Sequence, residues 1–131
     1  MTSPHDHKHT LEEGDAFAPR FDADGLVVCV TIEAATRQVL MVAYMNRLAL
    51  DKTIETGEAH YWSRSRRSLW RKGETSGQLQ RVVAIYVDCD QDALMLEVEP
   101  QGDGKACHTG RKSCFYRKLE RGAGNGLVFI E

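Results

Sequence analysis

Short apolar runs rich in β-branched residues constrain the fold of this chain more than any other feature. The runs LVVCVTI at 26–32 and QVLMVAYM at 38–45 are separated only by EAATR, which predicts a β-hairpin. A second pair, LQRVVAIYV at 79–87 and ALMLEVE at 93–99, flanks the short segment DCDQD. In the last run, apolar residues alternate with other side chains at the period of two that a half-buried strand requires. These runs predict a chain built mainly from strands.

One main helix is predicted between the two pairs of runs. Asn46 is a good N-cap residue, and Gly57 is a good residue for ending a helix about ten positions later. Leu50 and Ile54 lie four residues apart, so they share one face and give the helix a narrow apolar stripe. The helix is therefore expected to run from Asn46 to about Thr56.

The rest of the chain predicts smaller elements. Strands are expected at 59–65 (AHYWSRS), over SLWRKG from residue 68, and at 113–119 (SCFYRKL), with a loosely held end over 121–131. The glycine-rich segment QGDGKACHTGRKS, at 101–113, reads as a loop. Strands with one helix predict an α+β content, arranged as an open, barrel-like sheet.

Length and composition bound the class of protein. A chain of 131 residues fits one domain, expected at 21–131 after a mobile polar tail at 1–20. No apolar run approaches the roughly 20 residues that span a bilayer, and the N-terminus lacks the apolar core of a signal peptide. We therefore expect a cytoplasmic protein with no membrane partner. The net charge of −2 argues against nucleic acid as a partner.

The segment DCDQD places three carboxylates and a thiol in five residues. In an extended chain Asp88, Asp90 and Asp92 point to one side and Cys89 points to the other. Clustered carboxylate oxygens suit Mg²⁺, whereas a thiolate suits Zn²⁺. A solvated acidic turn explains the same residues without a metal, because carboxylates favour turns.

The cysteines carry a second, separate signal. Cys107 and Cys114 lie in a glycine-rich loop, where they are hard to explain as core residues, and Cys89 is a third candidate thiolate. Their spacing is not that of a zinc finger, and three thiolates leave one tetrahedral position open, as catalytic zinc sites do. His108 is a candidate general base, a fourth ligand or a loop hydrogen-bonding residue. Cys29 lies among valines and is expected to be a small core residue.

A basic segment completes the set of candidate site residues. Between His60 and Arg81 there are six basic residues and one acidic residue. Hydroxyls, guanidinium groups and glycine amides are the groups that bind phosphate. The aromatic ring of Trp62 can stack on a base or fill the core. The candidate substrate-binding residues are Arg64, Arg66, Lys72, Ser76 and Trp62.

Three long motifs occur in order and carry a resemblance to a known family. They are ETGEAHYWSRSRRSLWRKGETSG at 55–77, VDCDQDAL at 87–94 and ACHTGRKSCFYR at 106–117. The chain resembles the phosphoribosyl-AMP cyclohydrolases of histidine biosynthesis. The resemblance implies hydrolysis of the N1–C6 bond in the adenine ring of N1-(5-phosphoribosyl)-AMP, which yields the formimino-AICAR ribotide. Because the chain ends at Glu131, we expect the monofunctional form.

The same resemblance implies a fold, metals and an assembly. It implies a twisted mixed-sheet pseudo-barrel in an intertwined homodimer, with one Zn²⁺ and one Mg²⁺ per subunit. The zinc would be shared at the interface between Cys89 of one chain and Cys107 and Cys114 of the other. The magnesium would bind Asp88, Asp90 and Asp92.

The residue chemistry is compatible with this reaction. Bound zinc lowers the pKa of a water toward about 7, so zinc-bound hydroxide can attack C6 of the ring near neutral pH. His108 is the candidate to take or shuttle the proton. Two other classes compete with this hypothesis: a zinc-stabilised nucleic-acid-binding module, and a zinc deaminase, whose H-x-E and P-C-x-x-C signature the chain lacks.

Overall fold

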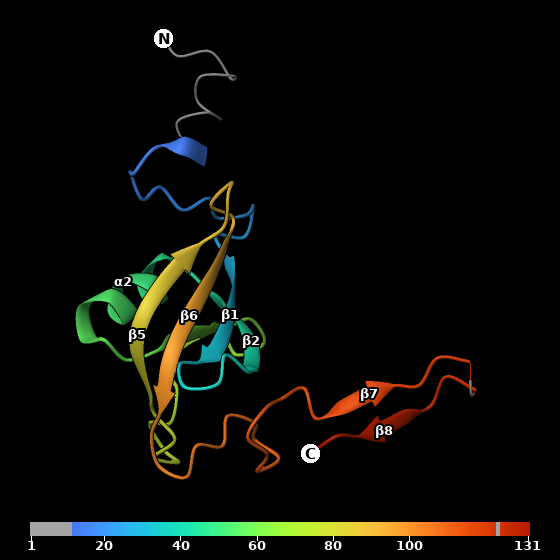
Figure 1. The fold of residues 1–131 in the computed structure, drawn as a ribbon. Coiled ribbons are helices and arrows are strands. Elements are labelled where there is room, and N and C mark those ends of the chain that lie inside the picture. Colours follow the sequence, from blue (N-terminus) through green and yellow to red (C-terminus); the bar gives the residue numbers. More distant parts are fainter. Residues whose placement is uncertain (1–11, 123) are drawn as a thin grey trace.

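The apolar runs that predict strands pair into one mixed sheet in the structure (Figure 1). This structure is a computed structural model that describes residues 12–122 and 124–131. The mainly β content and the one main helix are confirmed. The elements are β1 Val27–Glu33, β2 Val39–Met45, α2 Arg47–Thr56, β3 His60–Ser63, β4 Ser68–Arg71, β5 Gln80–Val87, β6 Ala93–Pro100, β7 Arg117–Leu119 and β8 Leu127–Phe129.

The central sheet has the strand order β2-β1-β6-β5. The β1–β2 and β5–β6 pairs are antiparallel hairpins, as their short connections require, whereas β1 and β6 pair in parallel. This parallel pairing joins the two hairpins and makes the sheet mixed. Two further antiparallel pairs, β3–β4 and β7–β8, lie outside this sheet.

The core lies where the central sheet meets α2 and β3. Alternate residues of β6, including Leu94 and Leu96, are buried there with Leu50 of α2 and Tyr61 of β3. Cys29 is fully buried in the same cluster, and burial raises the pKa of its thiol to about 12. Cys29 is therefore a core residue, as the sequence predicts.

Both ends of α2 form as the sequence predicts. The Asn46 side chain accepts a hydrogen bond from the amide of Ala49 at 2.9 Å, which satisfies one of the free donors of the first turn. At the other end Gly57 adopts the left-handed conformation, and its amide donates to the Thr53 carbonyl. These caps set the helix boundaries.

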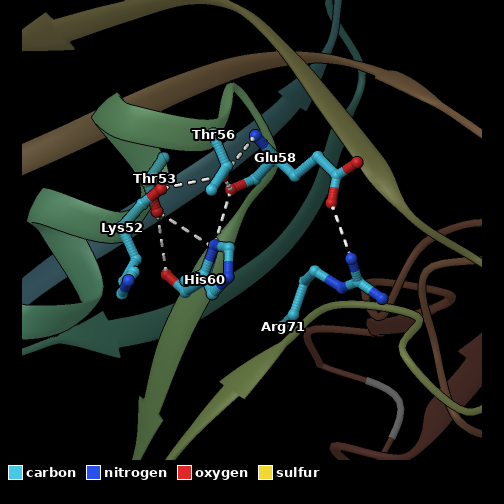
Figure 2. A network of polar contacts seen from close by, with 6 residues as sticks. All are labelled: Lys52, Thr53, Thr56, Glu58, His60 and Arg71. Carbon is cyan, nitrogen blue, oxygen red and sulfur yellow. Dashed lines mark hydrogen bonds and ion pairs between the residues drawn. The ribbon is translucent and has the colours of Figure 1, made fainter.

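A polar network attaches α2 to the β3–β4 hairpin (Figure 2). The buried Thr53 hydroxyl accepts from the amide of His60 at 2.9 Å and donates to the Ala49 carbonyl at 2.8 Å. Arg71, at the end of β4, pairs with Glu58 at 3.1 Å. The network fixes the start of β3 and the end of β4, and therefore the path of the chain into Lys72.

The C-terminal part of the described chain differs from the prediction. A loosely held end was expected over 121–131, but β8 pairs with β7 in an antiparallel hairpin. The predicted last strand over 113–119 is confirmed only for its final three residues. Figure 1 shows this hairpin projecting away from the central sheet. The run LVF of β8 is too short, and its turn too rich in glycine, for a strand to stand out in the sequence.

The segment that precedes β1 lies against the turn between β5 and β6 and is hydrogen-bonded to it. The Gln91 side chain accepts from the amide of Ala18 at 2.7 Å and donates to the Ala16 carbonyl, and the Arg20 amide donates to the Gln91 carbonyl. The mobile tail predicted at 1–20 includes residues 1–11, which lie outside the described residues, so the tail stays a prediction. Across the described residues, no helix has both the length and the apolar character that a membrane crossing demands.

Candidate functional site

The segment DCDQD forms a tight turn between β5 and β6. Gln91 has a φ of 60°, and its amide donates to the Asp88 carbonyl at 3.1 Å. One carboxylate oxygen of Asp88 accepts from the amides of Asp92 and Ala93, at 3.0 and 3.1 Å. The extended conformation in which alternate residues face opposite sides is therefore wrong, because Asp88 stabilises a turn instead.

The turn nevertheless brings the three carboxylates together. Oxygens of Asp88, Asp90 and Asp92 all lie within 4.8 Å of one another. Hydrogen bonding to Asp90 and Asp88, with burial and repulsion between the like charges, raises the pKa of Asp92 to about 6. Oδ1 of Asp90 is buried and has no hydrogen-bond partner among the described residues. An oxygen cluster with one unsatisfied buried atom fits a hard divalent cation.

A second cluster forms in the loop that follows β6. The thiols of Cys107 and Cys114 influence each other's pKa, and Lys72 interacts electrostatically with both. The Thr109 hydroxyl donates to Sγ of Cys107 at 3.0 Å. Burial on its own raises the pKa of Cys107, but the hydrogen bonds from Thr109 and Cys114, with the charge of Lys72, lower it overall. This pair of thiols is suited to a soft metal such as zinc.

Backbone hydrogen bonds hold the two thiols in place. The amide of Cys107 donates to the Arg111 carbonyl at 3.0 Å, which closes the loop on itself. The amide of Cys114 donates to the Leu40 carbonyl of β2 at 2.7 Å, and the Ser113 hydroxyl donates to the Val39 carbonyl at 2.7 Å. The thiol pair is therefore attached to the central sheet. The side chain of His108 is exposed in this loop beside Cys107.

Cys89 is not brought to the other two cysteines within one chain. It is exposed in the β5–β6 turn, before β6, whereas the loop with Cys107 follows the other end of that strand (Figure 1). A strand of eight residues spans roughly 26 Å. One chain therefore supplies two of the three predicted thiolates at one place and the third at the opposite end of the sheet.

Two of the predicted substrate-binding residues, Arg64 and Lys72, lie in different places. The guanidinium of Arg64 lies over the ring of Tyr44, 4.0 Å from its centroid. Tyr44 in turn lines a cavity of about 300 Å³ together with Arg20 and Asp92. Lys72 lies instead at the thiol pair, where its ammonium donates to the Ala106 carbonyl.

The other three candidates are partly or fully open to solvent. Arg66 and Ser76 are exposed, and the Ser76 hydroxyl accepts from the amide of Gln78 at 3.2 Å. Trp62 is half-buried in β3. These residues are accessible to a ligand but do not converge on a single group.

Sequence reasoning did not select Arg20, Tyr44, Gln91 or Thr109. Tyr44 reads as one more apolar strand residue, and Arg20 lies in a segment expected to be a tail. Their contacts join positions far apart in the chain, which no local pattern reveals. The contact of Thr109 could have been predicted from the sequence, because a hydroxyl two residues from a cysteine can reach its sulfur.

Comparisons with known proteins match most of this chain to one family. A family model described as phosphoribosyl-AMP cyclohydrolase matches residues 41–116, which include the acidic turn and both loop cysteines. The phosphoribosyl-AMP cyclohydrolase of Bradyrhizobium diazoefficiens is 63% identical over 126 residues, covering 95% of this chain and 89% of that protein. The Caulobacter vibrioides protein of the same name is 64% identical over 115 residues, covering 88% and 83%.

A third relative extends the match. The phosphoribosyl-AMP cyclohydrolase of Brucella canis is 59% identical over 117 residues, covering 89% of this chain and 84% of that protein. Each of these relatives is matched over nearly its whole length. The fold, the motifs and the matches define a cyclohydrolase. The chain belongs to the phosphoribosyl-AMP cyclohydrolase family of enzymes.

Proposed function

We propose that this enzyme hydrolyses the N1–C6 bond of N1-(5-phosphoribosyl)-AMP and releases the formimino-AICAR ribotide of histidine biosynthesis. The observation that carries the proposal is a match of 63% identity over 95% of the chain to a phosphoribosyl-AMP cyclohydrolase. The separate oxygen and sulfur clusters add physical support, because a ring-opening hydrolase with a phosphorylated substrate can use both a hard and a soft metal. Its expected location in the cytoplasm stays a prediction.

The acidic turn is the proposed magnesium site. Asp88, Asp90 and Asp92 would supply the oxygens, with the unsatisfied Oδ1 of Asp90 as the atom that most needs a partner. Mg²⁺ keeps several open coordination positions and commonly contacts substrate phosphate. Arg20 and Asp92 line the same cavity, so a phosphate there would meet both a guanidinium and the cation.

The loop cysteines are the proposed zinc ligands. Cys107 and Cys114 are already adjacent, and Cys89 of the partner subunit would complete the set of three. The separation of Cys89 from the other two within one chain supports a site shared between two copies. Zinc would supply a water whose pKa falls toward about 7, bound at the one tetrahedral position that three thiolates leave open.

The β7–β8 hairpin supports the proposed homodimer. A two-stranded hairpin is marginal in water unless another surface covers it. Several of its apolar side chains are exposed, including Leu127 at 55% and Phe129 at 65%. A second copy that covers this hairpin would give the intertwined dimer, and the closed pseudo-barrel expected for the family stays part of this proposal.

The other side chains have proposed roles in binding and proton transfer. His108 is exposed next to Cys107, so its imidazole can take the proton from the attacking water and return it to a ring nitrogen. Arg64 and Arg66 are proposed to bind phosphate oxygens, and Lys72 and Ser76 to add donors. Trp62 is proposed to stack on the adenine ring.

Ring opening of phosphoribosyl-AMP, followed by its ultraviolet absorbance change, tests the function directly. Wild-type protein should turn over, dialysis against a chelator should abolish activity, and added zinc should restore it. Cys107→Ala should lose more than about 100-fold in rate, because it removes a metal ligand rather than an outer contact. Equal rates in wild type and Cys107→Ala would overturn the zinc assignment, and no turnover in zinc-loaded wild type would overturn the function.

A further inference from the structure

Lys72 occupies a fixed position between β4 and the cysteine loop. Its amide donates to the Ala59 carbonyl at 3.0 Å, so its backbone is held at the start of β3. The preceding residue, Arg71, is anchored by its ion pair with Glu58 at 3.1 Å, which Figure 2 shows. The ammonium then crosses to the Ala106 carbonyl, directly before Cys107. This side chain therefore links two parts of the chain that are 34 residues apart.

The groups that face the Lys72 ammonium are the two loop thiols. Its positive charge acts to lower the pKa of both Cys107 and Cys114, and the ammonium also lies 5.9 Å from the centroid of the Trp70 ring. Cys107 is only 8% exposed, so solvent does little to screen charge on its sulfur. The hydrogen bond to Ala106 uses one of the three ammonium donors and leaves the positive charge beside the sulfurs.

Basic residues near this loop have partners of their own. Lys112 pairs with Glu33 at 2.7 Å, and Lys105 pairs with Asp103 at 3.8 Å. The Arg111 guanidinium lies over the Tyr116 ring, 4.2 Å from its centroid. Of these four basic residues, Lys72 is thus the one whose side chain is directed to the thiols.

The Lys72 ammonium can neutralise the net charge of the proposed zinc site. Three thiolates around Zn²⁺ carry one net negative charge, and an uncompensated charge at a partly buried site is unfavourable. One ammonium beside the ligands brings the total to zero. Polar groups just outside a metal's ligands also orient those ligands, and their loss typically weakens metal binding by roughly 10- to 100-fold.

We propose that Lys72 is a positioning residue of the zinc site, whose fixed positive charge balances the thiolate ligands and stabilises the bound metal. This inference rests on the proposed zinc ligation by Cys107 and Cys114. It assigns Lys72 to the metal site rather than chiefly to a substrate phosphate. The two remaining ammonium donors still leave it able to contact a ligand.

Three substitutions separate the charge from the hydrogen bond. Lys72→Arg keeps both, Lys72→Gln keeps a donor for the Ala106 carbonyl but loses the charge, and Lys72→Met loses both. Lys105→Met is the matched control, because it removes an exposed cation from the same loop. The measurement is zinc affinity of the full protein, by competition with a chromophoric chelator. The circular dichroism spectrum of each variant checks its fold.

The charge hypothesis predicts a specific order of affinities. Lys72→Gln and Lys72→Met should both bind zinc roughly 10- to 100-fold more weakly than wild type, whereas Lys72→Arg and Lys105→Met should stay within about threefold. Wild-type affinity in Lys72→Gln would overturn the charge role, even if Lys72→Met failed to fold. An equal loss in Lys72→Arg would overturn it as well.

Zinc affinity is measured without turnover, so the role of Lys72 can be disproved independently of the proposed ring-opening activity. Unchanged affinity in all variants of an active enzyme would overturn the role of Lys72 alone. Wild-type protein that binds no zinc would overturn the metal assignment as well.

Discussion

The carboxylates of Asp90 and Asp92 have different environments in the acidic turn. Oδ1 of Asp90 is buried without a partner among the described residues, while the pKa of its neighbour Asp92 is raised to about 6. The alternating spacing of the three carboxylates was enough to predict that they cluster. It did not predict the turn, which depends on the left-handed Gln91 and on the Asp88 carboxylate accepting two amides. The carboxylate cluster was thus inferred from an incorrect local geometry, and its assignment as a magnesium site stays a prediction.

Asp90→Asn tests the magnesium assignment. Loss of one ligand charge should raise the Mg²⁺ concentration needed for half-maximal activity by roughly tenfold or more, because ligand charge sets the affinity of oxygen sites. Zinc content, measured by atomic emission, should stay at the wild-type value. Loss of zinc in this variant would mean that the two proposed sites are one.

Glu33→Gln tests how the cysteine loop is attached to β1. The hydrogen bond and charge of Lys112, with a hydrogen bond from Thr36, lower the pKa of Glu33. A carboxylate with a lowered pKa stabilises the folded protein above its unfolded pKa of about 4.3, and this contribution is lost as the pH falls through the folded value. Because the pair is partly exposed, the variant should lose less than about 1 kcal/mol at pH 7.

Urea unfolding of wild type and Glu33→Gln across pH checks that expectation. The difference in unfolding free energy should be present at pH 7 and shrink below about pH 4. A difference that grew as the pH fell would contradict the role of the ionised carboxylate.

At the level of elements, local patterns predicted most of the fold. Period-two alternation and β-branched runs located β1, β2, β5 and β6, and residue types at the caps located α2. The parallel β1–β6 pairing was not predictable, because it joins distant segments through packing and not through any turn signal. The contacts of Arg64 with Tyr44 and of Lys72 with Ala106 are non-local in the same way.

The loop after β4 gives an element-scale prediction through two glycines. Gly73 and Gly77 both have left-handed φ values, 83° and 77°. A Cβ at Gly73 would lie 2.2 Å from the backbone carbon of Gln78, whereas one at Gly77 would meet nothing within 4 Å. Gly77→Ala should therefore cost about 1–2 kcal/mol of unfolding free energy, and Gly73→Ala more than about 3 kcal/mol.

Chemical denaturation of the two alanine variants measures this difference. Gly73→Ala should also weaken zinc binding, because the displaced backbone immediately follows Lys72. Equal stabilities for the two variants would contradict the tight packing of this loop.

For the whole molecule, the exposed hairpin and the divided cysteines point to the same conclusion. Among the described residues, apolar side chains of the β7–β8 hairpin stay exposed, and the three predicted thiolates lie at opposite ends of one sheet. Neither property could be read from spacing in the sequence, because both concern surfaces and distances in the folded chain. A second copy would resolve both.

Phe129→Glu tests the proposed dimer surface. A charge at this exposed aromatic position should shift the protein from dimer to monomer in light scattering, because burying an unpaired carboxylate is unfavourable. Ile54→Glu on α2 is the matched control, since Ile54 is also apolar and 54% exposed, and it should stay dimeric. A dimeric Phe129→Glu protein would place the interface elsewhere.

The central claim is that each active site combines cysteines from two chains, and mixing two inactive variants tests it most directly. Cys89→Ala and Cys107→Ala chains should each be inactive alone. After subunit exchange, verified by native mass spectrometry, hybrid dimers should restore up to about a quarter of wild-type ring-opening activity, because half of the dimers are hybrids with one intact site each. No recovery in a sample that contains hybrid dimers would contradict the shared site.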